Sequence, residues 1–143
     1  MQQGKSINEL TVGEKATMKR VYTDEDVRTF AKLSGDSNPL HLDEEYASKT
    51  KFKHRIVHGH LTSSMFSNIL GTTLPGLGTI YFIQNLKYIA PVYIGEEITY
   101  EVTINEINVE KNRVKFDTNA FNQEGQIVIK GEAVALPPKK VEE

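Results

Sequence analysis

The second half of the chain alternates hydrophobic and polar residues with a period of two. The alternation begins after Gly78, and its clearest apolar positions are Ile98, Tyr100, Val102 and Ile104, followed by Val114, Phe116 and Ala120. Successive side chains of a strand point to opposite faces, so this period predicts strands with one face against a core. A last strand is predicted from Gln126 to Leu136, after a turn at residues 122–125. A further strand over residues 15–22 precedes the predicted helices.

Two amphipathic helices are predicted in the first half of the chain. Thr23 followed by three acidic residues is typical of a helix N-terminus, and Gly35 ends this helix. Its predicted buried stripe is Val27, Phe30, Ala31 and Leu33. A short second helix should run from Asp43 to Lys49, with Tyr46 and Ala47 turned inward.

A third helix, from about Gly59 to Leu70, carries almost no charge. Its apolar positions recur at helical spacing between small hydroxyl residues, and they are Leu61, Met65, Phe66, Ile69 and Leu70. A helix without a charged face has no side to turn to water, so it should be buried. Helices followed by a four-strand meander therefore predict an α+β fold, in which a twisted antiparallel sheet wraps one long buried helix.

Residues 1–143 are predicted to form this one domain. A chain of 143 residues with 38% hydrophobic content suits a single core, and no shift in composition marks a boundary. Residues 1–14 should form a polar leading segment, and residues 137–143 a flexible tail. The sheet would leave a long edge unpaired, and a homodimer that joins two such edges is the simplest way to satisfy it.

Composition excludes several classes of function. A net charge of −2, with lysines spread along the sequence, provides no field that would attract nucleic acid. The absence of cysteine excludes a disulfide framework, a thiolate nucleophile and a cysteine zinc site. No apolar run approaches the roughly 20 residues that cross a bilayer, and the polar start lacks the apolar stretch of a signal peptide. We therefore expect no membrane partner and a cytoplasmic location.

The turn after the first helix carries the candidate chemistry. Asp36 and His41 lie five residues apart, in a segment where Gly35 and Pro39 prevent a regular helix. A carboxylate and an imidazole that share one water are suited to proton transfer near neutral pH. Taken alone, the segment could instead be an Asx turn in which Asp36 or Asn38 accepts backbone N–H bonds. A second motif at residues 52–61, leading into the buried helix, favours the catalytic interpretation.

Further motifs follow along the chain in a fixed order. They are Leu10-Thr11-Val12-Gly13-Glu14, the segment Ser34 to His41, Ile56-Val57-His58-Gly59, Phe66-Ser67, Leu74-Pro75-Gly76, the segment Ala90 to Glu96, and Gly131-Glu132-Ala133. In order and spacing the chain resembles, over nearly its whole length, the MaoC-like, (R)-specific enoyl-CoA hydratases of the hot-dog fold. The resemblance implies reversible hydration of a trans-2-enoyl-CoA to an (R)-3-hydroxyacyl-CoA.

The same resemblance implies roles for individual residues. Asp36 and His41 would hold between them the water that adds to the double bond. Gly59, at the start of the buried helix, would donate its N–H to the enolate oxygen, and its missing side chain would let the thioester approach closely. Ser67 would support the dyad from further along the helix, or act only as a small spacer.

The surroundings of the dyad complete the expected site. Asn38 should mainly shape the turn, with a modest orienting effect on Asp36. The acyl chain should run between the buried helix and the sheet, with Leu70 and Val134 as its far wall. No metal is expected, because no companion carboxylate stands at a zinc spacing from His54, His58 and His60. His58 should instead order the loop before Gly59. No cofactor is implied beyond the CoA of the substrate.

Three other functions remain open from the sequence. A hot-dog thioesterase would direct water at the thioester carbonyl, and a 3-hydroxyacyl-ACP dehydratase would perform the hydratase chemistry on a substrate borne by acyl-carrier protein. A non-catalytic binding domain is disfavoured by the joint presence of Asp36, His41 and Gly59. Arg55 and His60 stand where the resemblance predicts Pro and an apolar residue, so this chain departs from its relatives in the loop and at the pocket entrance.

Overall fold

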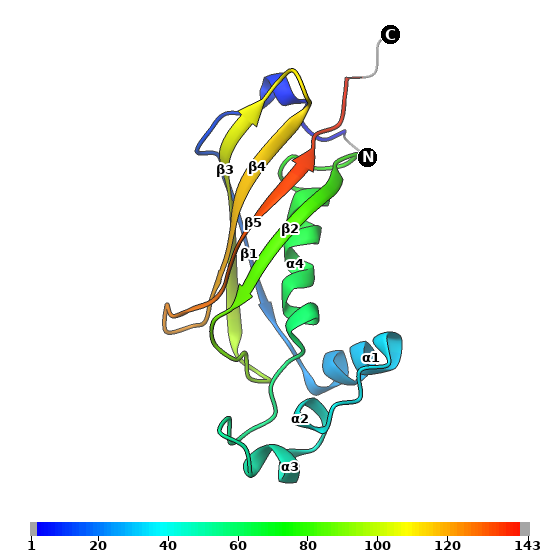
Figure 1. Ribbon diagram of the computed structural model, residues 1–143, viewed down its shortest axis with the longest axis vertical. Helices are drawn as coiled ribbons and strands as arrows, with labels where there is room; N and C mark the ends of the chain where they lie inside the picture. Colours follow the sequence, from blue (N-terminus) through cyan, green and yellow to red (C-terminus); the bar gives the residue numbers. More distant parts are fainter. Residues whose placement is uncertain (1–2, 141–143) are drawn as a thin grey trace.

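The uncharged helix lies at the centre of the fold. In the computed structural model, which describes residues 3–140, helix α4 (Gly59–Thr72) packs against one face of a five-stranded sheet (Figure 1). Its side chains Phe66, Ile69 and Leu70 are at most 1% exposed. Burying each of them contributes roughly 1.5–3 kcal/mol relative to exposure. The prediction of a long buried helix is confirmed.

The sheet is antiparallel throughout, with the strand order β1-β3-β4-β5-β2. The strands are β1 (Lys15–Val21), β2 (Ile80–Tyr88), β3 (Glu97–Asn108), β4 (Arg113–Phe121) and β5 (Ile127–Leu136). The predicted alternation is confirmed, because every second residue is buried in β3 as far as Ile104 and throughout β4: Ile98, Tyr100, Val102, Ile104, Val114, Phe116, Thr118 and Ala120. The structure therefore has the α+β layout of helix and sheet expected from the sequence.

The predicted four-strand meander is wrong for β2. Strands β3, β4 and β5 pair in sequence order, but β2 crosses to the far edge and pairs with β5. The connection from β2 to β3 contains Pro91 and is too long for a hairpin. Its backbone forms hydrogen bonds with other segments: the amide of Ile89 donates to the carbonyl of Val128, and the carbonyl of Val92 accepts from the amide of Val57. Strands β1 and β2 are consequently the two edges of the sheet.

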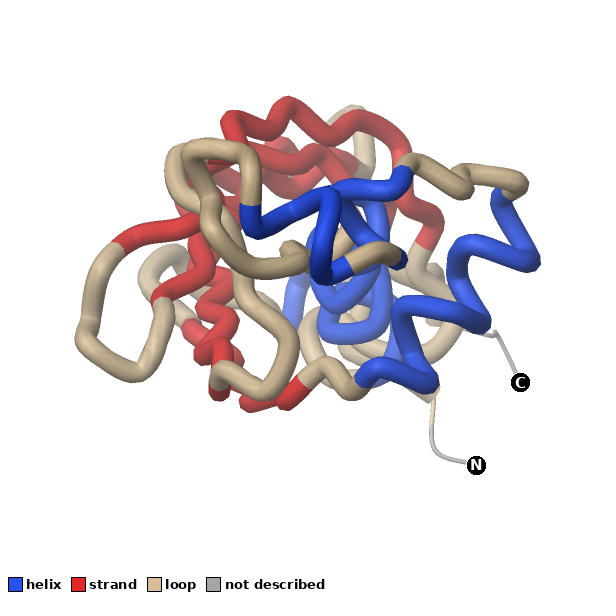
Figure 2. The backbone as a smooth tube through the Cα atoms, turned by 90° about the horizontal axis from the view of Figure 1, so that it is seen from below, coloured by secondary structure: helices blue, strands red, loops and turns tan. Residues whose placement is uncertain are grey.

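Three short helices form a layer below the sheet and the start of α4 (Figures 1 and 2). They are α1 (Asp24–Ser34), α2 (Pro39–Leu42) and α3 (Glu44–Ser48). Thr23 caps α1 by accepting from the amide of Asp26, and Gly35 ends it with φ of 81°, as expected. None of the helices within residues 3–140 is long and apolar enough to cross a membrane.

Two residues predicted to face inward from these helices are exposed. Leu33 is 81% exposed and Tyr46 is 49% exposed, whereas Val27, Ala31 and Ala47 are buried as predicted. The helical layer is thin and contacts the rest of the molecule on one side only. The helical spacing of apolar residues therefore does not predict which of them are covered by other residues.

The two ends of the described chain are more ordered than the sequence suggested. Ile7, in the 3₁₀-helix η1 (Ile7–Glu9), and Leu10 are buried, so the leading segment contributes to the core. Pro137 and Pro138 are also buried, and the side chain of Asn112 donates to the carbonyl of Pro137 at 2.9 Å. Residues 137 and 138 of the predicted tail are therefore packed against the domain, and its residues 141–143 lie outside the described part.

A chain of buried hydroxyl groups connects α4 to the sheet. The hydroxyl oxygens of Tyr22 and Tyr100 lie 2.7 Å apart, and Tyr100 donates to the carbonyl of Thr62 in α4 at 2.7 Å. Burial raises the pKa of both tyrosines above the ordinary value, because the anionic form would lose its hydration. The helix is thus fixed along its axis by polar contacts as well as by apolar packing.

We expect Tyr100→Phe to lower the free energy of unfolding by about 1 kcal/mol at neutral pH, through loss of one buried hydrogen bond. Because the folded pKa is raised, the native protein should be fully stable below pH about 10 and lose stability above it, where unfolded tyrosines ionise. Denaturant unfolding from pH 7 to 11 should show a shallower alkaline decline for Tyr100→Phe than for the wild type. The exposed-site variant Tyr46→Phe is the control, and an equal decline in both variants would contradict the assignment.

Candidate active site

The turn between α1 and α2 is fixed by its own side chains. The hydroxyl of Ser34 accepts from the amide of Asp36, the carboxylate of Asp36 accepts from Asn38, and the side chain of Asn38 accepts from Leu40, each at 3.1–3.2 Å. The Asx turn considered from the sequence is therefore present. It does not compete with the catalytic interpretation, since Asn38 caps α2 and so shapes the turn that carries both members of the dyad.

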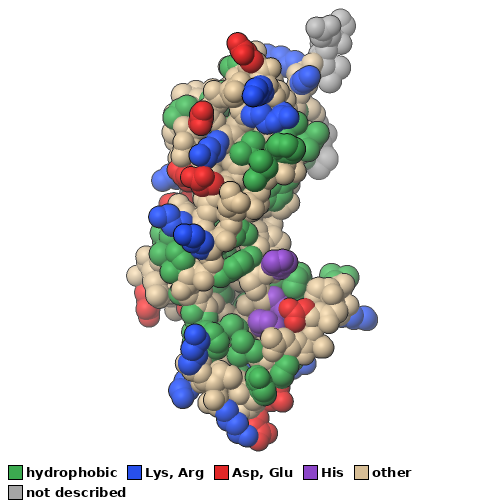
Figure 3. Space-filling view, viewed as in Figure 1, with side chains coloured by type: hydrophobic (Ala, Val, Ile, Leu, Met, Phe, Trp, Pro, Cys, Tyr) green, Lys and Arg blue, Asp and Glu red, His purple; other side chains and the backbone are tan. Residues whose placement is uncertain are grey.

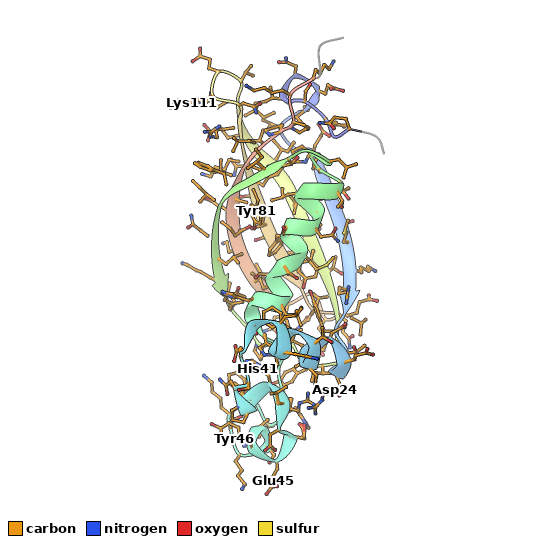
Figure 4. All side chains as sticks on the ribbon, turned by 90° about the vertical axis from the view of Figure 1, so that its right-hand side faces the viewer. Asp24, His41, Glu45, Tyr46, Tyr81 and Lys111 are labelled. Carbon is orange, nitrogen blue, oxygen red and sulfur yellow. The ribbon has the colours of Figure 1, made fainter. Side chains whose placement is uncertain are left out.

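Asp36 and His41 come together across this turn. A carboxylate oxygen of Asp36 and a ring nitrogen of His41 lie within 4.8 Å of each other. Two acceptors at that separation can share one water with hydrogen bonds of about 2.8 Å. His41 lies beside the N-terminal end of α4, next to the layer of short helices (Figure 4). Histidine and acidic side chains lie together in a recess of the surface there (Figure 3).

The orientation of the His41 ring follows from its one backbone contact. Its Nδ1 lies 2.8 Å from the carbonyl oxygen of Ile56. A carbonyl only accepts hydrogen bonds, so Nδ1 carries the proton of the neutral imidazole and Nε2 keeps a lone pair. His41 is buried, and the lone pair makes it a base for a water held at the dyad.

A pocket of about 370 Å³ opens beside His41. Its walls combine the imidazole, Gly59 and Thr62 of α4, and Tyr88 at the end of β2 with mostly apolar side chains: Phe52, Ile56, Val57, Ile89, Ala90, Pro91, Val92 and Ile129. A histidine and the first residue of a helix thus line one mostly apolar space, which is the usual composition of a small-molecule site.

Gly59 occupies the first position of α4. The first amides of a helix have no intrahelical acceptor and lie at the positive end of the helix dipole, so they attract a developing negative charge. A Cβ at residue 59 would lie 2.9 Å from Cε1 of Tyr88, whose hydroxyl donates to the side chain of Ser63 at 3.0 Å. The ring of Tyr88 therefore leaves no room for a side chain at position 59. No sequence pattern indicated this reason for a glycine at the start of α4.

Of the predicted site residues, only His41 and Gly59 line this pocket, and five do not: Asp36, Asn38, Ser67, Leu70 and Val134. Ser67 is on the exposed side of α4, and Leu70 is buried in the core between α4 and the sheet. Val134 lies on the opposite face of the sheet, because its neighbours Ala133 and Ala135 face the core. Its assignment to the wall of the acyl site is thereby corrected, and β5 contributes Ile129 to the pocket instead.

His58 lies against the dyad. Its Nε2 is 3.0 Å from the carbonyl oxygen of Asp36, and its ring stacks on His41 with centroids 3.9 Å apart. Burial lowers the pKa of His58, so this imidazole stays neutral. The single ring proton is then on Nε2, which donates to Asp36.

Asp36, His41 and His58 have ligand atoms within 4.8 Å of one another, a set that could suit a metal ion. However, the two imidazole planes are inclined by only 28°. A ring nitrogen binds a metal in the plane of its ring at about 2.0–2.1 Å, and two nearly parallel stacked rings direct their lone pairs poorly toward one ion. The geometry suits hydrogen bonding better, and a metal-free site stays the prediction.

The chain belongs to the MaoC-like family. The model of the MaoC-like domain matches residues 8–124. The (R)-specific enoyl-CoA hydratase of Aeromonas caviae is 42% identical over 133 residues, which cover 93% of this chain and 99% of that relative. The hot-dog domain expected from the resemblance is confirmed by solved structures of such hydratases.

Two further relatives bear on structure and substrate. The solved structure of an (R)-hydratase of Pseudomonas aeruginosa superposes with a TM-score of 0.90 at 42% identity, covering 99% of this chain and 92% of the other. A mitochondrial 3-hydroxyacyl-[acyl-carrier-protein] dehydratase of Arabidopsis thaliana is also 42% identical, over 90% of this chain and 78% of its own length. Two relatives that are equally identical to this chain are thus named for different substrates, one a thioester of CoA and the other a thioester of acyl-carrier protein.

We expect Asp36→Asn and His41→Ala each to lower kcat for hydration by at least about 100-fold, because the first removes the negative charge of the carboxylate and the second removes the imidazole base. Circular dichroism should show the native fold in both variants. The melting temperature of Asp36→Asn should stay close to the wild type because Asp36 is exposed, and that of His41→Ala should fall because a buried, hydrogen-bonded ring is lost. His54→Ala, at an exposed histidine paired only with Glu44, should keep full activity. Near-native turnover in either dyad variant would disprove the assignment.

Proposed function

We propose that the protein is an (R)-specific enoyl-CoA hydratase, a hydro-lyase that interconverts trans-2-enoyl-CoA and (R)-3-hydroxyacyl-CoA. The observation that carries the proposal is the placement of Asp36 and His41 within 4.8 Å of each other, with His41 and Gly59, the first residue of α4, lining one apolar pocket. The relationship to (R)-specific hydratases over nearly the full length of the chain supports the same reaction.

The geometry supports water activation together with polarisation of the thioester. C3 of an enoyl thioester is electrophilic only as far as negative charge can move to the carbonyl oxygen. The N–H of Gly59 would donate a hydrogen bond to the enolate oxygen that carries this charge, and one such donor can lower the barrier by roughly 3 kcal/mol. The oxygen of the water bonds to C3, the dyad takes up the proton that the water loses, and a proton from the dyad is delivered to C2.

Fixed positions for the water and the amide also account for a single stereochemical course. A thioester whose carbonyl oxygen is bound at Gly59 presents one face of its double bond to the water between Asp36 and His41. Attack on that face gives one configuration at C3. The (R) configuration is taken from the relatives, whose names specify it.

Lys51 is the most suitable residue for the phosphate-bearing end of the substrate. Among the described residues that line the pocket it alone has a permanent charge, and its Nζ lies 5.2 Å from the centre of the Phe52 ring. A cation beside an apolar pocket suits a thioester whose acyl group is buried while the anionic carrier remains outside. Phe52 is itself held, because Tyr93 donates to its carbonyl at 2.9 Å.

Dehydration of 3-hydroxyacyl groups on acyl-carrier protein is the second candidate function. The Arabidopsis relative with this name is as similar to the chain as the bacterial hydratases are. Both functions use the same bond changes and therefore the same dyad. They differ in the carrier, which would lie outside the pocket.

A homodimer joined at the β2 edge is part of the proposal. Strand β2 carries consecutive exposed apolar residues, with Ile80 60%, Phe82 56% and Ile83 44% exposed. The other edge, β1, carries Lys15, Lys19 and Arg20. A long apolar edge strand tends to pair with another chain, whereas charged residues oppose such pairing. A cytosolic location remains a prediction from the cysteine-free sequence.

Purified protein should consume crotonyl-CoA, with loss of enoyl absorbance and no release of free thiol. A coupled (R)-3-hydroxyacyl-CoA dehydrogenase should oxidise the product, and an (S)-specific dehydrogenase should not. Asp36→Asn should be inactive in the same assay. Thiol release without hydration would instead identify a thioesterase, and turnover of crotonyl-acyl-carrier protein with none of crotonyl-CoA would establish the second candidate.

Light scattering coupled to size-exclusion chromatography should give twice the mass of the chain. Ile80→Glu combined with Ile83→Glu should shift the protein toward the monomer, because two charges at the paired edge would be desolvated. The matched control is Val21→Glu on the β1 edge, which should remain dimeric. Dissociation by the β1 change alone would place the interface on the other edge.

A further inference from the structure

One short segment, Arg55–His58, contacts both members of the dyad through their backbone carbonyls. His58 donates from Nε2 to the carbonyl of Asp36 at 3.0 Å. Arg55 donates from Nε to the carbonyl of His41 at 2.7 Å. Each dyad residue is therefore held by a side chain that does not itself have to meet the substrate.

Ile56, between these two residues, holds the same turn through its backbone. Its carbonyl accepts from Nδ1 of His41 at 2.8 Å, and its amide donates to the carbonyl of Leu40 at 3.4 Å. The segment thus fixes the ring of His41 as well as the main chain on both sides of it. The next residue after His58 is Gly59, so the contacts made by this segment link the dyad directly to the amide that would bind the thioester oxygen.

The environment of His58 indicates a role beyond packing. The side chain is 1% exposed, stacks on His41 and meets the edge of Phe30 with ring centroids 4.9 Å apart. Its Nδ1 is buried without a hydrogen-bond partner among the described residues. An unsatisfied buried acceptor is unfavourable, and an apolar side chain of the same size would avoid it. The histidine provides two contacts together: an aromatic face that stacks on the ring of His41, and an N–H that donates to the carbonyl of Asp36.

Arg55 connects the dyad to α1. Its side chain is only 14% exposed, and a terminal nitrogen of its guanidinium lies 2.6 Å from the carboxylate of Asp24. The hydrogen bonds from Arg55 and Arg28 lower the pKa of Asp24, which keeps the partner of Arg55 ionised. The proline that the family resemblance predicts at position 55 has no side-chain donor and could make neither contact.

We propose that Arg55 and His58 are positioning residues, which together set the distance from the dyad to the Gly59 amide. The inference rests on the proposed hydratase function. The dyad lies in the thin layer of α1 and α2, whereas Gly59 belongs to α4, and a small displacement between the two would separate the water from C3. Misplacement of reacting groups by about 1 Å can slow a reaction by roughly 100-fold without a change of chemistry.

The two contributions of His58 can be separated by substitution. His58→Gln retains a donor for Asp36 and loses the aromatic face, whereas His58→Phe retains the face and loses the donor. We expect each to lower kcat for crotonyl-CoA about tenfold, with KM within about twofold. The pH values at which kcat is half-maximal should not move, because the titrating dyad is intact. His54→Gln, at an exposed histidine, should behave as wild type.

Arg55 has a matched control in Arg28, since both pair with Asp24 but only Arg55 bonds to His41. Arg55→Ala should lower kcat about tenfold, and Arg28→Ala should leave it within twofold. Equal losses in both variants would show that the ion pair with Asp24 matters and not the contact with His41. Loss of activity only in proportion to a lowered melting temperature would likewise overturn the positioning role.

A measurement without substrate separates this proposal from the proposed function. Long-range proton–nitrogen NMR spectra of the histidine rings should show neutral His41 protonated at Nδ1 and neutral His58 protonated at Nε2. In Arg55→Ala and His58→Phe the His41 signals should broaden or shift, and in Arg28→Ala they should not. Neutral His58 protonated at Nδ1, or His41 signals unchanged in both Arg55→Ala and His58→Phe, would overturn the proposal even in a protein that hydrates crotonyl-CoA.

Discussion

The structure depends on the burial of a helix that has no charged face. Helix α4 can be stable only where the sheet covers it, and the sheet covers it only if β1 and β3 meet it on one side and β2 closes from the other. The buried hydroxyl groups of Tyr22 and Tyr100 then fix its axial position through the carbonyl of Thr62. The same constraint brings the first amide of α4, at Gly59, to the boundary between the core and the helical layer.

The candidate site forms at that boundary because two different kinds of local structure meet there. The layer of α1 and α2 contributes a polar turn, in which side chains cap the backbone and hold Asp36 and His41. The core contributes an apolar pocket and the unpaired amide of a helix N-terminus. An ionisable pair in water would be a poor catalyst, and a dry pocket would have no base. Their junction combines both.

Several features of this arrangement were predictable because they are local. The alternation of β3 and β4 and the stop of α1 at Gly35 follow from one strand or one helix at a time. The expectations that proved wrong involved contacts between distant segments. Leu33 and Tyr46 had the right period and no surface to cover them, and β2 paired with β5 across the sheet and not with its neighbour in sequence. Val134 was misplaced because only the register tells which face of β5 meets α4.

The sequence by itself determined the strands and the helices α1, α3 and α4, but not η1 or the short α2 that carries His41. It also determined the dyad with its spacing across a turn and the family to which the chain belongs, since these are recorded in short segments. Only the tertiary structure decided that Tyr88 requires glycine at position 59, and that Arg55 and His58 each hold the carbonyl of one dyad residue. Both facts depend on contacts between residues 14 to 29 positions apart. Such contacts leave no period and no motif, because packing of the whole chain selects them.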